Sequence, residues 1–219
     1  MPLRKRLENE MDAVENTILR MGAVTEEALH KAIQALKTRD HELARSVVKD
    51  DAHIDSLQLN IDQQIARTIA IEQPVANDLR RLLSYMKQAA EMERIGDHAR
   101  HIASASLRIS ETGAEHILPL LQQMCQVGTE MLHSALNAFM ERDASQAEKI
   151  AARDDEVDSL HAQAYREIVA NMEKDSRRIQ DGTNLIMISR YFERAADHVT
   201  NMCEWIVYSR RGEHVELNS

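Results

Sequence analysis

Residues 91–99 of the chain read EMERIGDHA and residues 191–199 read YFERAADHV, so the pattern Glu-Arg-x-x-Asp-His occurs twice, 100 residues apart. In each copy the Glu and the Asp are four positions apart, within an apolar pattern of helical period. On a helix this spacing places two side chains on one face, with their Cβ atoms about 5–6 Å apart. Two carboxylates this close repel each other. We therefore expect a cation beside them, which could be a metal ion, a neighbouring Arg or a neighbouring His.

A second pair of acids is also duplicated. Asp51 and Asp55 precede the first copy, and Asp154 and Asp158 precede the second, 103 residues further along the chain. The two acids of each pair are again four positions apart, on the helix before the Glu-Arg-x-x-Asp-His segment. Each half of the chain thus carries two acidic pairs on two successive helices, which indicates a tandem duplication.

The composition is typical of a protein that is nearly all helix. The 219 residues include only 6 Gly, 3 Pro and 3% aromatic residues, whereas strands favour β-branched and aromatic side chains. Apolar residues recur at helical spacing in six segments. We predict an all-α fold of six helices without a sheet, arranged as two tandem three-helix bundles related by a pseudo-twofold duplication. Residues 1–110 form the first bundle, 116–219 the second, and 111–115 the linker.

Several helix ends can be predicted. The first two helices are expected over about residues 8–38 and 42–72. Asp40 is placed to cap the second helix, because an Asp at this position accepts hydrogen bonds from free backbone N–H groups, and Asp143 occupies the matching position in the second half. The last helix is expected to begin within the polar run 176–182.

Charge and hydropathy exclude other classes of protein. The formal net charge is −9, which argues against nucleic acid binding through a surface that neutralises phosphates. No apolar run approaches the roughly 18 residues needed to span a bilayer, and residues 1–6 lead into a polar pattern without an apolar signal core. We expect a cytoplasmic protein without direct membrane insertion. Cys125 and Cys203 lack metal-site spacing and are expected to be buried, reduced thiols.

The four acidic pairs are candidate metal ligands. Adjacent antiparallel helices have axes about 8–10 Å apart, so the two pairs of each half can converge and hold one or more cations through their oxygens. The acids avoid the apolar stripes, which places them on the outside of each bundle or in a shallow groove. Continuing the spacing by four adds a His in the first half and an Asn in the second. The candidates are Asp51, Asp55, Glu93, Asp97 and His101, and then Asp154, Asp158, Glu193, Asp197 and Asn201.

Two other interpretations compete with this one. The acids could be solvated and paired with Arg and Lys, in which case the chain is a helical scaffold that binds no metal. Alternatively, the repeated Glu-x-x-His of Glu27–His30 and Glu130–His133 has the spacing of a ferritin-like dinuclear metal oxidase or hydrolase. Those enzymes project the motif inward, whereas these four side chains point away from the apolar stripe of their helix. We expect them to be exposed to solvent.

With these motifs in place, the chain resembles the PhoU family of bacterial phosphate-signalling proteins over essentially its whole length. The resemblance is carried by Met21-Gly22, Arg39-Asp40, Asp50-Asp51 with Ile54-Asp55, the run QPVANDLR at 73–80, both Glu-Arg-x-x-Asp-His segments and the run TNMCEW at 200–205. It implies two tandem three-helix bundles whose acidic motifs hold mononuclear or polynuclear sites for divalent or trivalent metal ions, such as Mg, Mn, Zn or Fe.

The resemblance also implies a function that is not enzymatic. Members of the family are negative regulators of the phosphate-starvation response and link the ATPase of the phosphate ABC transporter (PstB-like) to a sensor histidine kinase (PhoR-like). It further implies a homodimer. His101 stands where the family usually has Asn, and this departure allows the first-half site to differ from the second in metal or occupancy.

Overall fold

The structure, a computed structural model, describes residues 2–110 and 112–217 and contains no strand in these two ranges. This confirms the predicted all-α fold without a sheet. The helices are α1 (Pro2–Thr38), α2 (His41–Glu72), α3 (Asn77–Ser106), α4 (Leu118–Glu141), α5 (Ala144–Ala151), α6 (Asp154–Lys174) and α7 (Ile179–Arg211), with a short 3-10 helix, η1 (Ser176–Arg178), before α7.

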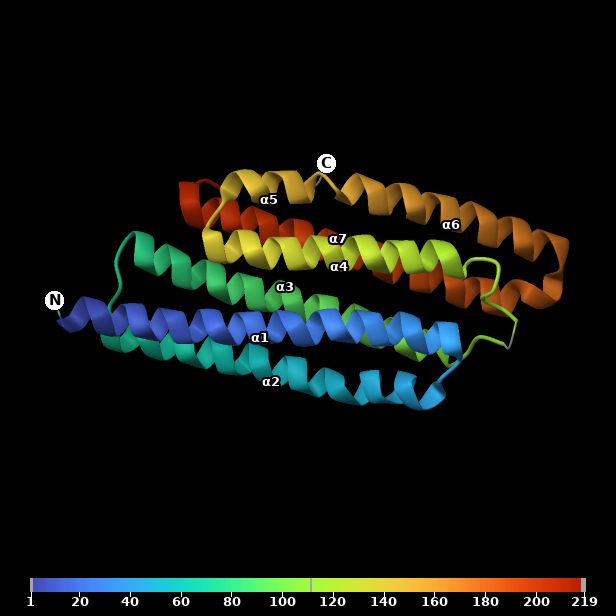
Figure 1. Cartoon of the computed structure of the whole chain (residues 1–219), viewed down its shortest axis with the longest axis horizontal. Helices are drawn as coiled ribbons and strands as arrows, with labels where there is room; N and C mark the ends of the chain where they lie inside the picture. The colour runs from blue at the N-terminus through green and yellow to red at the C-terminus, as the bar shows by residue number, and fades with distance from the viewer. Residues whose placement is uncertain (1, 111, 218–219) are drawn as a thin grey trace.

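The seven α-helices of residues 2–110 and 112–217 lie side by side as long rods, with α5 and α6 following one another in a single rod (Figure 1). In the first half, α1, α2 and α3 pack against one another, and in the second half α4, the α5–α6 rod and α7 do the same. The two halves meet along α3 and α7, which run antiparallel, and α1 also packs on α4. Glu111, the first residue of the predicted linker, lies outside the described residues.

The α5–α6 rod differs from its counterpart in the first half of the chain. Its counterpart α2 is continuous, whereas residues 152–153 interrupt the rod between α5 and α6. Asp154, Asp155 and Glu156 then occupy the first turn of α6. Negative side chains are favourable there because the N-terminus of a helix carries a partial positive charge. The interruption thus places Asp154, one of the candidate ligands, at the beginning of a helix.

The predicted helix caps are present. The Asp40 carboxylate accepts hydrogen bonds from the backbone N–H groups of Glu42 and Leu43 at 3.0 and 2.9 Å, and the Asp143 carboxylate accepts two at 3.0 Å in the second half. The last helix begins at Ile179, within the predicted run. The first helix begins at Pro2 rather than near residue 8. Pro is favourable in the first turn of a helix, where its missing N–H is no loss.

The predicted apolar stripes form the core. The apolar residues that recur at helical spacing along α7 are buried, namely Leu185, Ile188, Phe192, Ala195, Ala196, Val199, Met202, Cys203 and Ile206. Cys125 and Cys203 are both buried free thiols. Burial raises the pKa of each thiol to about 12, so both side chains act as small apolar groups and not as nucleophiles.

Within the described ranges, we find no helix that combines the length and the apolar character needed to cross a membrane.

Candidate metal centres

The structure gathers the eight predicted acids into two clusters. Asp51 and Asp55 of α2 lie beside Glu93 and Asp97 of α3, and we name these four residues the α2–α3 cluster. The α6–α7 cluster consists of Asp154, Asp158, Glu193 and Asp197. Burial is the largest cause of a raised pKa at Asp51, and the nearby Asp55 and Asp97 raise it further. Burial likewise dominates at Asp154, where Asp197 and Asp158 raise the pKa further.

The α2–α3 cluster already contains a cation, the guanidinium of Arg100. Its Nε lies 2.6 Å from Oδ2 of Asp51, on the neighbouring helix. Its Nη2 donates a hydrogen bond of 2.6 Å to Oδ1 of Asp97, one turn earlier on the same helix. Arg94 adds weaker contacts from the surface, at 3.4 Å from Asp97 and 3.5 Å from Glu93. One arginine thus bridges carboxylates of both helices.

Arg100 carries a positive charge in the folded protein. The hydrogen bond to Asp97 raises its pKa above the already high value of a free arginine, and Asp51 contributes to the same shift. Guanidinium groups are protonated in proteins at any pH at which they fold. The α2–α3 cluster is therefore partly neutralised from within the chain.

The α6–α7 cluster has no equivalent bridge. The position three residues after Asp197 is Thr200, which is fully buried. Arg190 pairs with Oε1 of Glu193, but it lies one turn earlier on the same helix and half of its side chain is exposed. Oδ1 of Asp154 and Oε2 of Glu193 are buried and have no hydrogen-bond partner among the described residues.

The pKa values of the acids in the α6–α7 cluster reflect this lack of a bridging arginine. Burial raises the pKa of Asp154 to about 7, and repulsion from Asp197 and Asp158 adds to the shift. The pKa of Glu193 also rises to about 7, through burial and then through Asp197. Carboxylates that hold protons near neutral pH are carboxylates without enough positive charge around them. A bound cation would supply the positive charge that these carboxylates lack.

The donor set of the α6–α7 cluster fits a hard metal ion. Carboxylate oxygens are the ligands preferred by Mg²⁺, Mn²⁺ and related cations, and the two unpartnered oxygens could coordinate one. No three His, Cys, Asp or Glu side chains in residues 2–110 and 112–217 are already arranged as a metal site, so binding requires side chains to turn. Asp158 is exposed on α6 and has room to turn. The α2–α3 cluster fits less well, because Arg100 holds Asp51 and Asp97.

Glu193 is more deeply buried than we predicted. We expected these carboxylates on the outside of each bundle or in a shallow groove, but Glu193 is only 7% exposed. The reason is that α7 packs against α3, α4, α5 and α6, so more of its surface is covered than a single apolar stripe indicates. The expectation holds better for Asp55 and Asp158, which are exposed.

His101 and Asn201, the fifth candidate of each half, lie at the α3–α7 interface. The ring of His101 stacks on that of Tyr191, with centroids 5.0 Å apart, and its Nε2 is 3.2 Å from Nη2 of Arg100. Asn201 donates a hydrogen bond of 3.1 Å to Oε2 of Glu91. Their participation as metal ligands stays a prediction.

The role of Arg100 was not predicted from the sequence. The neighbouring Arg and His expected beside the first acidic pair were Arg94 and His98, which adjoin it in the sequence. Arg100 follows Asp97 by three residues, a spacing at which helical side chains are neighbours. That spacing was the available signal, but the contact with Asp51 depends on how α2 packs against α3.

The Glu-x-x-His repeats do not form a dinuclear site. Glu27, His30, Glu130 and His133 are all exposed, as predicted. Glu27 pairs with Lys31 at 2.8 Å, and Glu130 pairs with Arg153 at 2.9 Å. These side chains are engaged in surface ion pairs and do not converge in the core.

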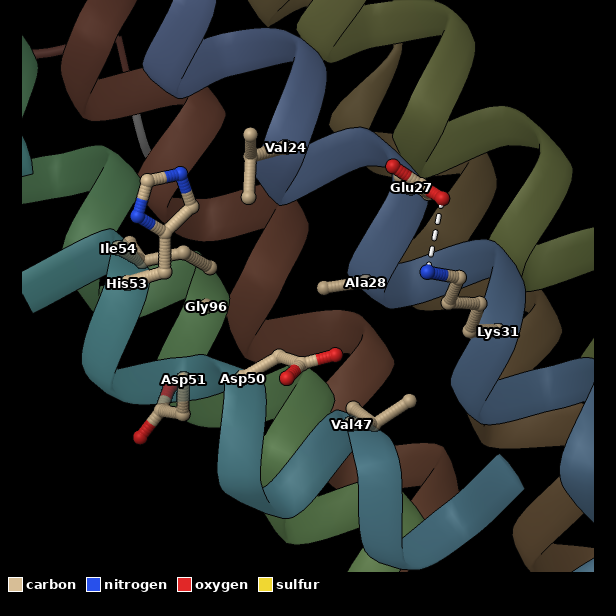
Figure 2. A pocket seen from close by; sticks show the side chains of 10 residues that line it. All are labelled: Val24, Glu27, Ala28, Lys31, Val47, Asp50, Asp51, His53, Ile54 and Gly96. Carbon is tan, nitrogen blue, oxygen red and sulfur yellow. Dashed lines mark ion pairs between the residues drawn. The ribbon is translucent and has the colours of Figure 1, made fainter. Parts of the chain in front are cut away.

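A cavity of about 260 Å³ lies next to the α2–α3 cluster, between α1 and α2 (Figure 2). Its lining is mainly apolar and includes Val24, Ala28 and Ile54. Figure 2 shows Asp50 and Asp51 pointing in different directions, with Asp51 turned away from Ala28. Asp51 lines this cavity and also contacts Arg100, so the cavity borders the α2–α3 cluster.

Comparison with known proteins identifies what the chain is similar to. A family model described as the PhoU domain matches residues 18–106 and again residues 121–206. The phosphate-specific transport system accessory protein PhoU homolog of Clostridium acetobutylicum is 33% identical over 216 residues, which cover 98% of this chain and 99% of the relative. The phosphate-specific transport system accessory protein PhoU of Escherichia coli is 32% identical over 204 residues, covering 93% of this chain and 85% of the relative.

Solved structures agree with the sequence comparison. The crystal structure of the phosphate transport system regulatory protein PhoU from Streptococcus pneumoniae superimposes with a TM-score of 0.90 at 33% identity, covering 96% of this chain and 99% of that one. The crystal structure of PhoU from Pseudomonas aeruginosa gives a TM-score of 0.88, also at 33% identity, with coverage of 94% and 99%.

Proposed function

Because the chain belongs to the PhoU family, whose members are regulatory accessory proteins of phosphate transport and not enzymes, we propose that it represses the phosphate-starvation response when phosphate is plentiful. The observation that carries the proposal is the family match in both halves of the chain. It includes both Glu-Arg-x-x-Asp-His segments, so the similarity extends to the candidate site as well as to the fold.

In this role the protein is a cytoplasmic adaptor. It contacts the ATPase of the phosphate ABC transporter and a sensor histidine kinase, and it keeps the kinase inactive while the transporter is supplied with phosphate. The names of the relatives, which are accessory proteins of phosphate-specific transport, support the contact with the transporter. Six long rods also offer extended side surfaces, which suit a protein that contacts two partners or a second copy of itself in a homodimer.

The metal ion belongs to the same proposal. The α6–α7 cluster would hold a divalent or trivalent cation through its four carboxylates, with the side-chain oxygen of Asn201 as a further ligand. When bound, the cation neutralises these carboxylates and joins α6 to α7. Its role is structural, because the site lies where two helices meet. The unpartnered oxygens of Asp154 and Glu193 support this assignment.

Deletion of the gene tests the regulatory function. In phosphate-rich medium, a strain without the protein is expected to produce more alkaline phosphatase than the parent strain, because the kinase is no longer held inactive. Expression of the intact chain from a plasmid should restore repression. Unchanged phosphatase output after deletion would count against the proposal.

Affinity capture tests the partners. The tagged chain is expected to retain the transporter ATPase and the sensor kinase from a lysate of cells grown with ample phosphate. Purified ATPase, added alone, distinguishes direct contact from contact through the kinase. Failure of both purified partners to bind would contradict the adaptor role.

A further inference from the structure

The two acidic clusters derive from one duplicated unit, yet they differ at a position next to the acids on the final helix of each half. The residue three positions after the second acid of the Glu-Arg-x-x-Asp-His segment is Arg100 in the first half and Thr200 in the second. The arginine that contacts carboxylates of both helices thus occurs in only one of the two sets of four carboxylates.

Arg100 lies between α2 and α3. It contacts Asp51 and Asp97, each at 2.6 Å, and two thirds of its side chain are buried. A guanidinium matches carboxylates in shape as well as charge, and contacts in which both partners are ionised are stronger than neutral hydrogen bonds. It already engages two of the oxygens that a metal ion would need.

Arg190, beside the α6–α7 cluster, does not bridge two helices in this way. Arg190 forms its ion pair with Glu193, on its own helix, and half of its side chain is exposed. Meanwhile Glu193 is 7% exposed and its Oε2, like Oδ1 of Asp154, has no hydrogen-bond partner in the part of the chain that the structure describes. Buried carboxylate oxygens without partners are costly, so a bound cation would stabilise this cluster once its acids are ionised.

We propose that Arg100 is the built-in cation of the α2–α3 cluster, and that the chain therefore takes up metal at the α6–α7 cluster alone. This inference rests on the metal site of the proposed function and explains why the first half does not contain a second one. A metal ion entering the α2–α3 cluster must first break the hydrogen bond between Arg100 and Asp97 and the ion pair between Arg100 and Asp51. We expect its affinity there to be weaker by roughly tenfold or more, from the usual strength of such contacts.

Metal counting in single variants tests the proposal. The full chain is stripped with a chelator, dialysed, and titrated with Mn²⁺, and the bound Mn²⁺ per chain is measured after gel filtration. The wild-type chain is expected to bind Mn²⁺, and D158N/D197N is expected to abolish that binding. The Arg100→Thr variant, which copies the second half, is expected to gain binding that persists in the D158N/D197N background and disappears when Asp97→Asn is added.

Two controls isolate the bridging contact from charge in general. Arg94→Thr removes a positive charge from the surface of the same cluster but leaves the bridge intact, so no gain is expected. Arg100→Lys keeps a charge at the position and is expected to gain less than Arg100→Thr. Circular dichroism and thermal melting establish that each variant folds, and Arg100→Gln, which retains more of the side-chain length, serves if the Thr variant does not.

The outcomes separate this inference from the proposed function. Mn²⁺ binding by the wild-type chain that survives D158N/D197N would overturn the role of Arg100 while leaving a metal-binding protein. So would a folded Arg100→Thr variant that gains no binding while the second-half site stays active. Absence of Mn²⁺ binding in every variant would instead overturn the metal site of the proposed function.

Discussion

Nδ1 of His198 lies 2.7 Å from Oε2 of Glu91, so a residue of α7 and a residue of α3 pair directly across the boundary between the halves. Both side chains are largely buried. Asn201 donates to the same oxygen of Glu91. Glu91 thus connects the first half to two residues that follow Asp197 in the second, within the next turn of α7.

Glu91 and His198 are predicted to be energetically coupled. In a double-mutant cycle of Glu91→Ala and His198→Ala, we expect a coupling of about 0.5–1.5 kcal/mol in the free energy of unfolding, because each single substitution leaves a partner unsatisfied. Chemical denaturation of the four proteins measures it. As a control, Arg4 and Glu8, exposed on α1, should couple by less than about 0.5 kcal/mol. A coupling near zero at Glu91 and His198 would contradict the prediction.

The metal-free chain is predicted to lose stability as the pH rises through about 7. Asp154 and Glu193 have folded-state pKa values of about 7 against ordinary values of 3.8 and 4.5. Between these limits the folded chain binds more protons than the unfolded chain, so the free energy of unfolding falls as the pH rises. Thermal melting in the presence of a chelator, from pH 5 to pH 8, measures this.

The matched control for the pH experiment is the D154N/E193Q variant. It lacks the two carboxyl groups with the largest pKa shifts, so its melting temperature should fall less over the same range than that of the wild-type chain. Added Mn²⁺ should also reduce the loss in the wild-type chain, because ions compete with protons for the same oxygens. Identical pH profiles for the variant and the wild-type chain would refute the assignment.

The two aspartate caps are predicted to contribute equally to stability. Asp40→Ala and Asp143→Ala each remove the acceptor of two backbone N–H groups, and each should lower the free energy of unfolding by about 1 kcal/mol. Asp40→Asn retains an oxygen acceptor and should cost much less. Urea denaturation compares the three. A loss of similar size in the Asn variant would show that the cap acts through charge and not through its hydrogen bonds.

The exposed Glu-x-x-His repeats are predicted to be irrelevant to metal content. Glu27→Ala and Glu130→Ala should bind as much Mn²⁺ as the wild-type chain, because both side chains lie on the surface in ion pairs. Equilibrium dialysis against Mn²⁺ measures the difference, with D158N/D197N as the variant expected to lose binding. A loss of metal in the Glu27 or Glu130 variants would favour a dinuclear oxidase site.

Periodicity in the sequence was enough to predict the helices and their buried faces. Positions such as Ile188, Phe192 and Val199 recur at helical spacing, and burial follows from spacing because a helix presents one face to its neighbours. The four-residue spacing of the acids was likewise enough to predict that Asp51 and Asp97 approach each other. Both features depend on residues close in sequence and on the simplest antiparallel packing of helices.

The remaining features depend on contacts between helices, which periodicity does not report. Arg100 reaches Asp51 because of the way α2 lies against α3, and Glu193 is buried because α7 has neighbours on several sides. The interruption at Ala152 contains neither Gly nor Pro, so no residue that breaks helices marked it. Asp154 and Asp155 follow the interruption, but acidic residues are common inside helices as well as at their ends, so they did not mark it either.

The break between α5 and α6 gives the second half a mechanical weakness that the first half lacks. α5 has only 8 residues, fewer than the roughly 12–15 at which an isolated helix becomes even marginally stable in water. It relies on tertiary contacts, including the Arg211–Glu148 ion pair to the end of α7. Its amides are therefore expected to exchange with deuterium before those of α6, so that local opening starts immediately upstream of Asp154. Duplication has thus produced two copies of one helical unit that differ in rigidity as well as in charge.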